Sequence, residues 1–192
     1  MKNQAPRPNH GAARPRLNQL RILCATALMA ALSIVLGKYL QIPLGDSIRI
    51  SFENLPVLMA GIFFGPVIGG AVGMTADLLG CVLVGYSINP IITAGAALVG
   101  ILSGAVAHLF RRGGRDLTAT AVITAVYTAH AVGSMTVKSF GLWVYFSTPL
   151  PLLLARVPVY VAVGALEATV IWLLARNRIF MGELRRLLTK KR

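Results

Sequence analysis

Four cationic side chains stand apart from the other basic residues, because they lie in or beside hydrophobic stretches. They are Lys38, Arg49, Lys138 and Arg156. Charges at membrane depth are costly, and they persist mainly where they pair, line a water-filled cavity or hold a ligand. Arginine grips a carboxylate through two parallel hydrogen bonds, whereas lysine acts as a point charge. These residues predict a site for an anionic ligand, with pairing to the chain's own carboxylates as the alternative.

Polar and aromatic residues that could complete such a site occur in three segments. One leads into the second hydrophobic stretch, one forms the turn before the fourth, and one connects the last two. Their candidate residues are Arg49, Ser51 and Phe52; Tyr86 and Asn89; and Lys138, Trp143 and Arg156. Helix caps and interfacial aromatics use the same residue types, which leaves a structural alternative for each segment. If the segments converge on one cavity, they would suit a flat, anionic, water-soluble ligand.

Sequence motifs of enzymes and metal sites are missing. An intramembrane enzyme would need a nucleophile with a base or a metal-ligand cluster, but neither HExxH nor GxSxG occurs. Cys24 and Cys81 lie in separate apolar stretches without CxxC spacing, and the histidines are scattered. We therefore expect two buried, unpaired cysteines, no metal, no cofactor and no enzymatic activity.

The composition requires lipid as part of the solvent. Of the 192 residues, 56% are hydrophobic and only 13% are charged, which is too much apolar surface for one water-soluble core. Several hydrophobic runs reach the roughly 17 to 25 residues needed to cross a hydrocarbon layer about 30 Å thick. The first run, from Ile22 to Leu40, is long for a signal peptide. We predict an all-α membrane protein, a compact bundle of six transmembrane helices.

Helix boundaries follow from the polar breaks and prolines. We expect helices at about residues 20–40, 55–64, 67–84, 90–110, 117–137 and 150–174. Residues 1–19 are predicted to be a disordered basic tail, 20–177 the membrane substrate-binding domain, and 178–192 a basic C-terminal tail. For the N-terminal tail, a membrane-proximal role is favoured over nucleic-acid binding.

The distribution of charge predicts the orientation in the membrane. Six spans place both termini and the connection near residue 112 on one side, with 15 of the 19 basic residues. Short cytoplasmic segments collect lysine and arginine, so this side is expected to be cytoplasmic. The four remaining cations then fall in the outer half of the bundle.

Small residues repeat at helical spacing in two places. Gly61, Gly65, Gly69 and Gly73 recur every four residues, a pattern that lets membrane helices approach closely. Packing within the chain is favoured over a partner interface. Ala27 and Ala31 form a second, AxxxA stripe, which could accept another protein's helix.

Several of these motifs together resemble a known family. The run Phe63-Phe64-Gly65-Pro66-Val67-Ile68-Gly69-Gly70-Ala71-Val72-Gly73, followed by Asp77-Leu78, is similar to the hairpin of the substrate-binding S components of energy-coupling factor (ECF) transporters. Arg49-Ile50-Ser51-Phe52, Gly85-Tyr86-Ser87-Ile88-Asn89-Pro90 and the AxxxA stripe fit the same family. The resemblance covers about residues 20–177. Within the family, the chain most resembles the folate-specific members.

The resemblance implies a multi-pass subunit of the cell membrane, expected to be the bacterial plasma membrane. It would capture folate or a similar small anionic vitamin at the outer face and deliver it through a transmembrane coupling protein and two ATP-binding cassette ATPases. No P-loop GxxxxGK[ST] occurs here, in agreement with ATP hydrolysis in those partners. Ala27 and Ala31 would dock on the coupling protein.

Folate carries a flat pterin and two carboxylates, which suggests a role for each candidate residue. Asn89 and Asp77 are assigned to the pterin edge, and Ser51 to a further hydrogen bond. Phe52, Tyr86 and Trp143 would stack, while Arg49, Lys138 and Arg156 would hold carboxylates. Two alternatives stay open: an S component for riboflavin, thiamin or a queuosine precursor, and a membrane scaffold or assembly protein without a ligand.

Overall fold

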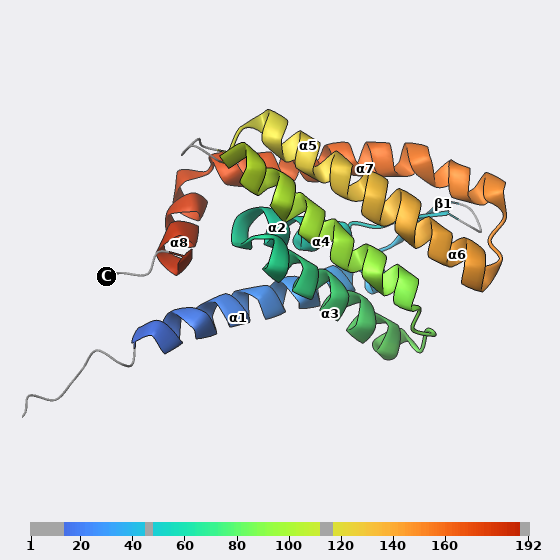
Figure 1. Ribbon diagram of the computed structural model, residues 1–192, viewed down its shortest axis with the longest axis horizontal. Coiled ribbons are helices and arrows are strands. Elements are labelled where there is room, and N and C mark those ends of the chain that lie inside the picture. Colours follow the sequence, from blue (N-terminus) through green and yellow to red (C-terminus); the bar gives the residue numbers. More distant parts are fainter. Residues whose placement is uncertain (1–13, 45–47, 112–116, 189–192) are drawn as a thin grey trace, which may run out of the picture.

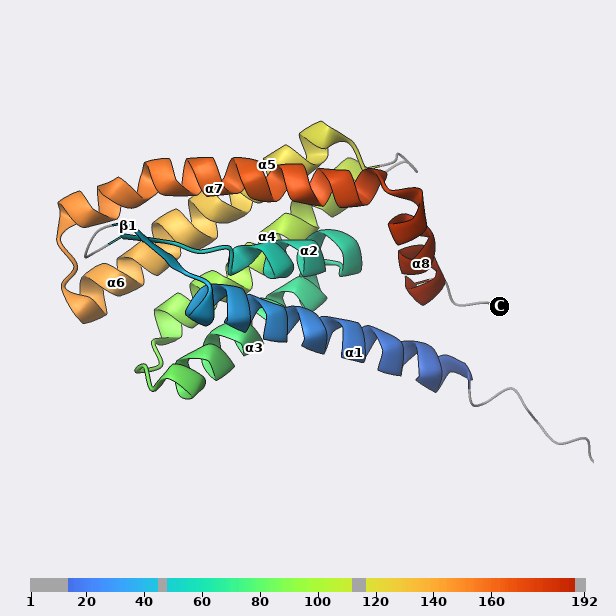
Figure 2. The same ribbon diagram turned by 180° about the vertical axis from the view of Figure 1, so that it is seen from behind.

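Long apolar helices build most of the molecule (Figure 1, Figure 2). The computed structural model describes residues 14–44, 48–111 and 117–188. Within that part of the chain, five helical runs are long and apolar enough to cross a membrane. They are Gln19–Tyr39, Pro66–Val84, Pro90–Arg111, Ala119–Phe146 and Leu150–Arg176. The predicted all-α membrane bundle is confirmed, with five long helices and one shorter apolar helix.

The elements follow one another with short connections. The first half comprises α1 (Arg14–Ile34), the π-helical turn η1 (Val35–Tyr39), the strands β1 (Ile42–Leu44) and β2 (Ile48–Ile50), α2 (Asn54–Phe64), α3 (Pro66–Val84) and α4 (Pro90–Arg111). The second half comprises α5 (Ala119–Ala129), the π-helix η2 (His130–Lys138), α6 (Ser139–Phe146), α7 (Leu150–Arg176) and α8 (Arg178–Leu188).

Three elements differ from the predicted ones. α1 begins at Arg14, within the segment expected to be a disordered tail, because a proline is tolerated in the first turn of a helix. The fifth helix continues through η2 and α6 to Phe146, since no proline or polar break interrupts its aromatic end. The C-terminal tail contains α8, whose Phe180, Met181 and Leu184 pack against the core.

The polar break before α2 also has structure of its own. β1 and β2 pair antiparallel, with Ile42 opposite Ile50 and Leu44 opposite Ile48. Their backbone groups thus satisfy one another, which matters at membrane depth because unpaired backbone groups cost several kcal/mol in lipid. Residues 45–47, and with them Asp46, lie outside the described residues.

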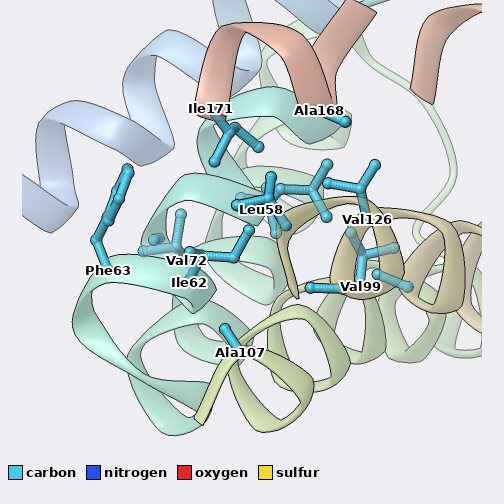
Figure 3. Packing of buried hydrophobic residues seen from close by; sticks show 14 of the residues in the cluster. Leu58, Ile62, Phe63, Val72, Val99, Ala107, Val126, Ala168 and Ile171 are labelled. Atoms are coloured by element: carbon cyan, nitrogen blue, oxygen red, sulfur yellow. The ribbon is translucent and has the colours of Figure 1, made fainter. Parts of the chain in front are cut away.

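The short helix α2 occupies the centre of the bundle. Its 11 residues span only about 16 Å, about half of the hydrocarbon thickness. Leu58 and Ile62 on α2 are almost fully buried and meet Val99 of α4, Val126 of α5 and Ile171 of α7 in one core (Figure 3). Apart from Asn54 at its start, this half-length helix is apolar, and it is stable here because longer helices surround it.

Glycines allow the backbones of α2, α3 and α4 to approach closely. Gly65 has a φ of 103°, which favours glycine, and it forms the corner before Pro66 opens α3. A side chain at Gly69 would collide with the backbone of Gly61 and Gly100, and one at Gly73 with the carbonyl of Ala96. The prediction that these glycines pack within the chain is confirmed for Gly61, Gly69 and Gly73, whereas an added Cβ at Gly65 would meet nothing within 4 Å.

The connections gather at two opposite ends of the bundle. The start of α1, the α2–α3 corner, the start of α5 and α8 lie at one end, and the hairpin, the α3–α4 turn and the α6–α7 connection lie at the other (Figure 1, Figure 2). α8 contacts α1, and its Phe180 ring lies 5.3 Å from that of Phe63. Cys81 is buried as expected, but Cys24 is exposed, because α1 presents one face to the surroundings of the bundle.

Replacing Gly100 by alanine should lower the stability of the bundle. The added methyl group would collide with the backbone carbonyl of Gly69, and overpacking of this kind costs about 1–3 kcal/mol. Thermal unfolding in detergent micelles measures the effect. Gly182→Ala on α8 is the control, because nothing lies within 4 Å of the added carbon. Equal melting temperatures for the two variants would contradict the tight α3–α4 packing.

Candidate functional site

A cavity of 430 Å³ opens at the hairpin end of the bundle, a volume within the usual range of small-molecule sites. It lies between the start of α2, α6 and the first half of α7. The polar lining residues are Gln41, Ser51, Glu53, Asn54, Thr148, Arg156 and Tyr160, and the apolar ones are Leu142, Leu152, Val159 and Val163. Polar groups from the segment before α2 thus face an arginine on α7 across an apolar wall.

Arg156 is the cation that lines this cavity within the described part of the chain. Its two terminal nitrogens donate hydrogen bonds to the Ser139 hydroxyl and the Tyr160 hydroxyl, both at 3.0 Å. Tyr160 lies one turn further along α7, and the guanidinium carbon sits 5.3 Å from the centre of its ring. No described carboxylate lies within 4 Å of Arg156, and a guanidinium has five N–H donors. Donors therefore remain for an anion in the cavity.

A second, very small hollow of 20 Å³ lies beside the cavity and shares Glu53 and Asn54 with it. Lys138 lines this hollow, where its ammonium group donates to a Glu53 carboxylate oxygen at 2.9 Å and to the Asn54 side-chain oxygen at 3.4 Å. Only 6% of Lys138 is exposed. Lys138 is thus held by groups of the chain, which is the pairing alternative to ligand binding.

The far side of the same hollow holds further polar side chains. Asp77 accepts a hydrogen bond of 2.6 Å from the Thr93 hydroxyl, which joins α3 to α4. Lys38 reaches the face of the Tyr86 ring, with 5.4 Å between the ammonium nitrogen and the ring centre. The polar lining of the hollow thus comes from η1, α3 and η2 as well as from the start of α2.

The π-helix η2 positions two of the buried polar groups. Its wider turns carry His130 at one end and Lys138 at the other, and such segments often mark functional sites. His130 Nε2 lies 2.5 Å from a Glu167 carboxylate oxygen, with both side chains fully buried. The His130 ring also lies 5.3 Å from that of Tyr160. These contacts connect η2 to α7, and Tyr160, which the His130 ring contacts, also accepts a hydrogen bond from Arg156.

The structure brings together only some of the predicted site residues. Ser51 and Arg156 line the larger cavity, and Asp77 and Lys138 line the smaller hollow. Phe52, Tyr86, Asn89 and Trp143 line neither, and the Arg49 side chain lies outside the described residues although its backbone belongs to β2.

Asn89 and Trp143 have local explanations in the fold. The Asn89 side-chain oxygen accepts hydrogen bonds from the backbone N–H groups of Ile91 at 2.9 Å and Ile92 at 3.3 Å, so it caps α4. Trp143 is 57% exposed on the outside of α6, where an interfacial aromatic residue would lie. Both placements agree with the structural alternatives that the sequence left open.

Glu53, Asn54 and Tyr160 line the cavity but are not among the ligand-binding residues predicted from the sequence. Glu53 and Asn54 directly follow the candidate Ser51, and Tyr160 lies four residues after the candidate Arg156, on the same helix face. These spacings could have identified them. Among the described residues, no three His, Cys, Asp or Glu side chains converge in a way that could hold a metal ion.

Comparison with protein families and individual sequences gives two matches. A family model described as "ECF transporter, substrate-specific component" matches residues 21–189. The folate transporter FolT of Clostridium novyi (strain NT) is 37% identical over 67 residues, which are 35% of this chain and 38% of that protein. The matched stretch thus spans well under half of that relative.

Solved structures share the fold along nearly the whole chain. FolT bound with folic acid superposes with a TM-score of 0.66 and 19% identity, covering 81% of this chain and 93% of that one. The S component of a bacterial ECF transporter gives 0.64 and 21%, covering 90% and 99%. The S component for biotin from an ECF-type ABC transporter gives 0.62 and 17%, covering 84% and 94%.

The ion pair between Glu53 and Lys138 should be energetically coupled. A double-mutant cycle with Glu53→Gln and Lys138→Gln is expected to give a coupling free energy of about 1–3 kcal/mol, because each single change leaves the partner charge poorly solvated. Chemical unfolding in micelles provides the four free energies. The exposed pair Glu183–Arg186 on α8, at 2.6 Å, is the control and should give about 0.5 kcal/mol or less. Equal couplings in both pairs would contradict the buried role of Lys138.

Proposed function

The chain belongs to the family of substrate-specific components of ECF transporters, and from this premise we propose that it captures folate in the cavity beside Arg156. The observation that carries the proposal is the lining itself: an arginine with unused donors on one wall, and a carboxylate and an amide on the other. The relatives named for folate support the choice of ligand. The family is one of transport components and not of enzymes.

The charges of the lining suggest how folate would be oriented. The pterin ring carries several N–H donors and ring acceptors on one edge, which suit the Glu53 carboxylate and the Asn54 amide. The glutamate carboxylates would be repelled by Glu53 and attracted by Arg156, which can bind one of them through two parallel hydrogen bonds. A wrong ligand would leave these groups unpaired, and that penalty provides selectivity.

The proposal keeps only some of the ligand-binding roles that were predicted from the sequence. Arg156 as a carboxylate partner and Ser51 as a hydrogen-bonding group are retained in the proposal. Lys138 would act through Glu53, whose carboxylate it holds in place. Roles in binding for Arg49, Phe52, Asp77, Tyr86, Asn89 and Trp143 stay predictions.

We further propose an orientation and partners. The hairpin end would face outward, and both termini would lie in the cytoplasm of a bacterium, as the distribution of basic residues indicates. An apolar groove of 450 Å³ between α1 and α3 is lined by Ala27 and Ala30 of α1, and Ala27 and Ala31 are both exposed. This face would dock on a transmembrane coupling protein, with ATP hydrolysed by two ATPases bound to it.

Folate should stabilise the purified protein more than riboflavin, thiamin or biotin does. Binding to the folded state alone raises the melting temperature with ligand concentration, so a thermal-shift screen in detergent ranks the four vitamins. Stabilisation by another vitamin would replace folate within the same family, and stabilisation by none would favour the scaffold alternative.

Arg156→Ala should weaken folate binding by about 1–3 kcal/mol, or roughly 5- to 150-fold, because a charge-assisted hydrogen bond to a carboxylate is lost. Isothermal titration or tryptophan fluorescence measures the dissociation constant. Arg186→Ala is the control, since it removes the same charge from exposed α8 at the other end of the bundle. Unchanged affinity in Arg156→Ala would remove this arginine from the site.

Ala27→Trp and Ala31→Trp should leave folate binding intact but prevent uptake. The bulky ring would obstruct close helix packing against a coupling protein, while the cavity at the hairpin end is unaffected. Uptake of labelled folate by cells that produce the whole transporter is compared with binding to the purified subunit. Loss of binding in these variants would instead show that the stripe packs within the chain.

A further inference from the structure

A second large hollow lies at the end of the bundle opposite the vitamin cavity. Its volume is 490 Å³, and it forms where the start of α5, the end of α7 and the first turn of α8 meet. The walls include Leu117, Trp172, Ala175, Arg176, Arg178 and Met181. The hollow therefore combines two guanidinium groups with an apolar wall.

The two arginines are available for an anion. Among the described residues, neither has a carboxylate within 4 Å, and Glu183 of α8 pairs with Arg186 instead, at 2.6 Å. The Arg176 guanidinium lies over the Trp172 ring, 5.5 Å from its centre, which helps to hold it in place although the residue is exposed. Arg178 begins α8 next to it.

The helix that ends at the hollow indicates the depth of the hollow in the membrane. Arg176 is the last residue of a membrane-spanning helix, so the hollow lies at the boundary between hydrocarbon and water, where tryptophan is enriched. Packing of Phe180 on Phe63 and burial of Leu184 hold α8 across this end of the bundle. The walls are thus formed without any ligand.

We propose that this hollow binds the phosphodiester headgroup of an anionic membrane phospholipid, with phosphatidylglycerol as the representative case. Arg176 and Arg178 would donate to the phosphate oxygens, and Leu117 and Met181 would contact the first carbons of the acyl chains. Basic pockets between helices at a membrane surface bind such headgroups. A free phosphate ion would use the arginines but leave the apolar wall without a partner. The proposal is independent of which vitamin the chain binds.

Titration of the full-length protein in neutral detergent with phosphatidylglycerol tests the proposal, with phosphatidylcholine of the same acyl chains as the comparison. Phosphatidylglycerol should raise the melting temperature in a saturable manner, and phosphatidylcholine should not. In the double variant Arg176→Gln/Arg178→Gln, the apparent affinity should fall about 30-fold, since each arginine near a membrane surface contributes roughly 5-fold. Equal effects of the two lipids on the wild type would overturn the proposal.

The matched control is Arg21→Gln/Arg186→Gln, which removes the same charge from α1 and α8 without touching the hollow. It should retain the wild-type affinity, and an equal loss would show general attraction to a basic surface and refute the site. Inorganic phosphate should give no comparable shift; if it does, the site is one for a soluble anion and the lipid is wrong. Should the double variant not fold, native mass spectrometry of the wild type with equal amounts of both lipids decides, because equal retention refutes the proposal.

Discussion

The structure of the hairpin end depends on the buried ammonium group of Lys138, which needs partners for its charge. A charge inside an apolar bundle is tolerable only with close, well-oriented partners. Glu53 and Asn54 supply them from the start of α2, 85 and 84 residues away in sequence, respectively. The same two residues face the cavity that Arg156 lines. The group that neutralises the lysine is therefore also a wall of the candidate ligand site.

Bringing Glu53 to Lys138 requires a short α2 and close backbones. A helix of 11 residues begins halfway through the bundle, so its first turn lies at depth. The glycine contacts among α2, α3 and α4 bring these helices close enough to leave no room for side chains. At Gly37 an added Cβ would collide with the Glu53 side chain, so η1 also approaches this carboxylate. The close packing of small residues among α2, α3 and α4 thus also places the Glu53 carboxylate beside Lys138.

The sequence predicts the helices better than it predicts the site. Hydrophobic runs and prolines placed the long helices to within a few residues, apart from the ends at Arg14, Phe146 and α8, where propensity and packing extend helices into polar or aromatic segments. Site residues depend on side-chain direction. Arg156 and Ser51, which were predicted from residue type, line the cavity. Asn89 instead caps a helix and Trp143 lies on the outside of the bundle. Residue type alone could not separate these cases, because helix caps and interfacial aromatics share their composition with binding sites. From the sequence, Glu53 is one of the carboxylates that could pair with the four cations, and it is not predicted to bind the ligand.

The two ends of the bundle use arginine in opposite settings. At the hairpin end, a carboxylate and a lysine neutralise each other beside Arg156, so that the cavity offers one guanidinium and one acceptor wall. Such a balanced site can orient a ligand that carries donors at one end and carboxylates at the other. At the α8 end, two arginines line a hollow in which no described carboxylate opposes them. Two guanidinium groups beside an apolar wall suit an anionic headgroup with its acyl chains, whereas a paired set distinguishes one end of a molecule from the other.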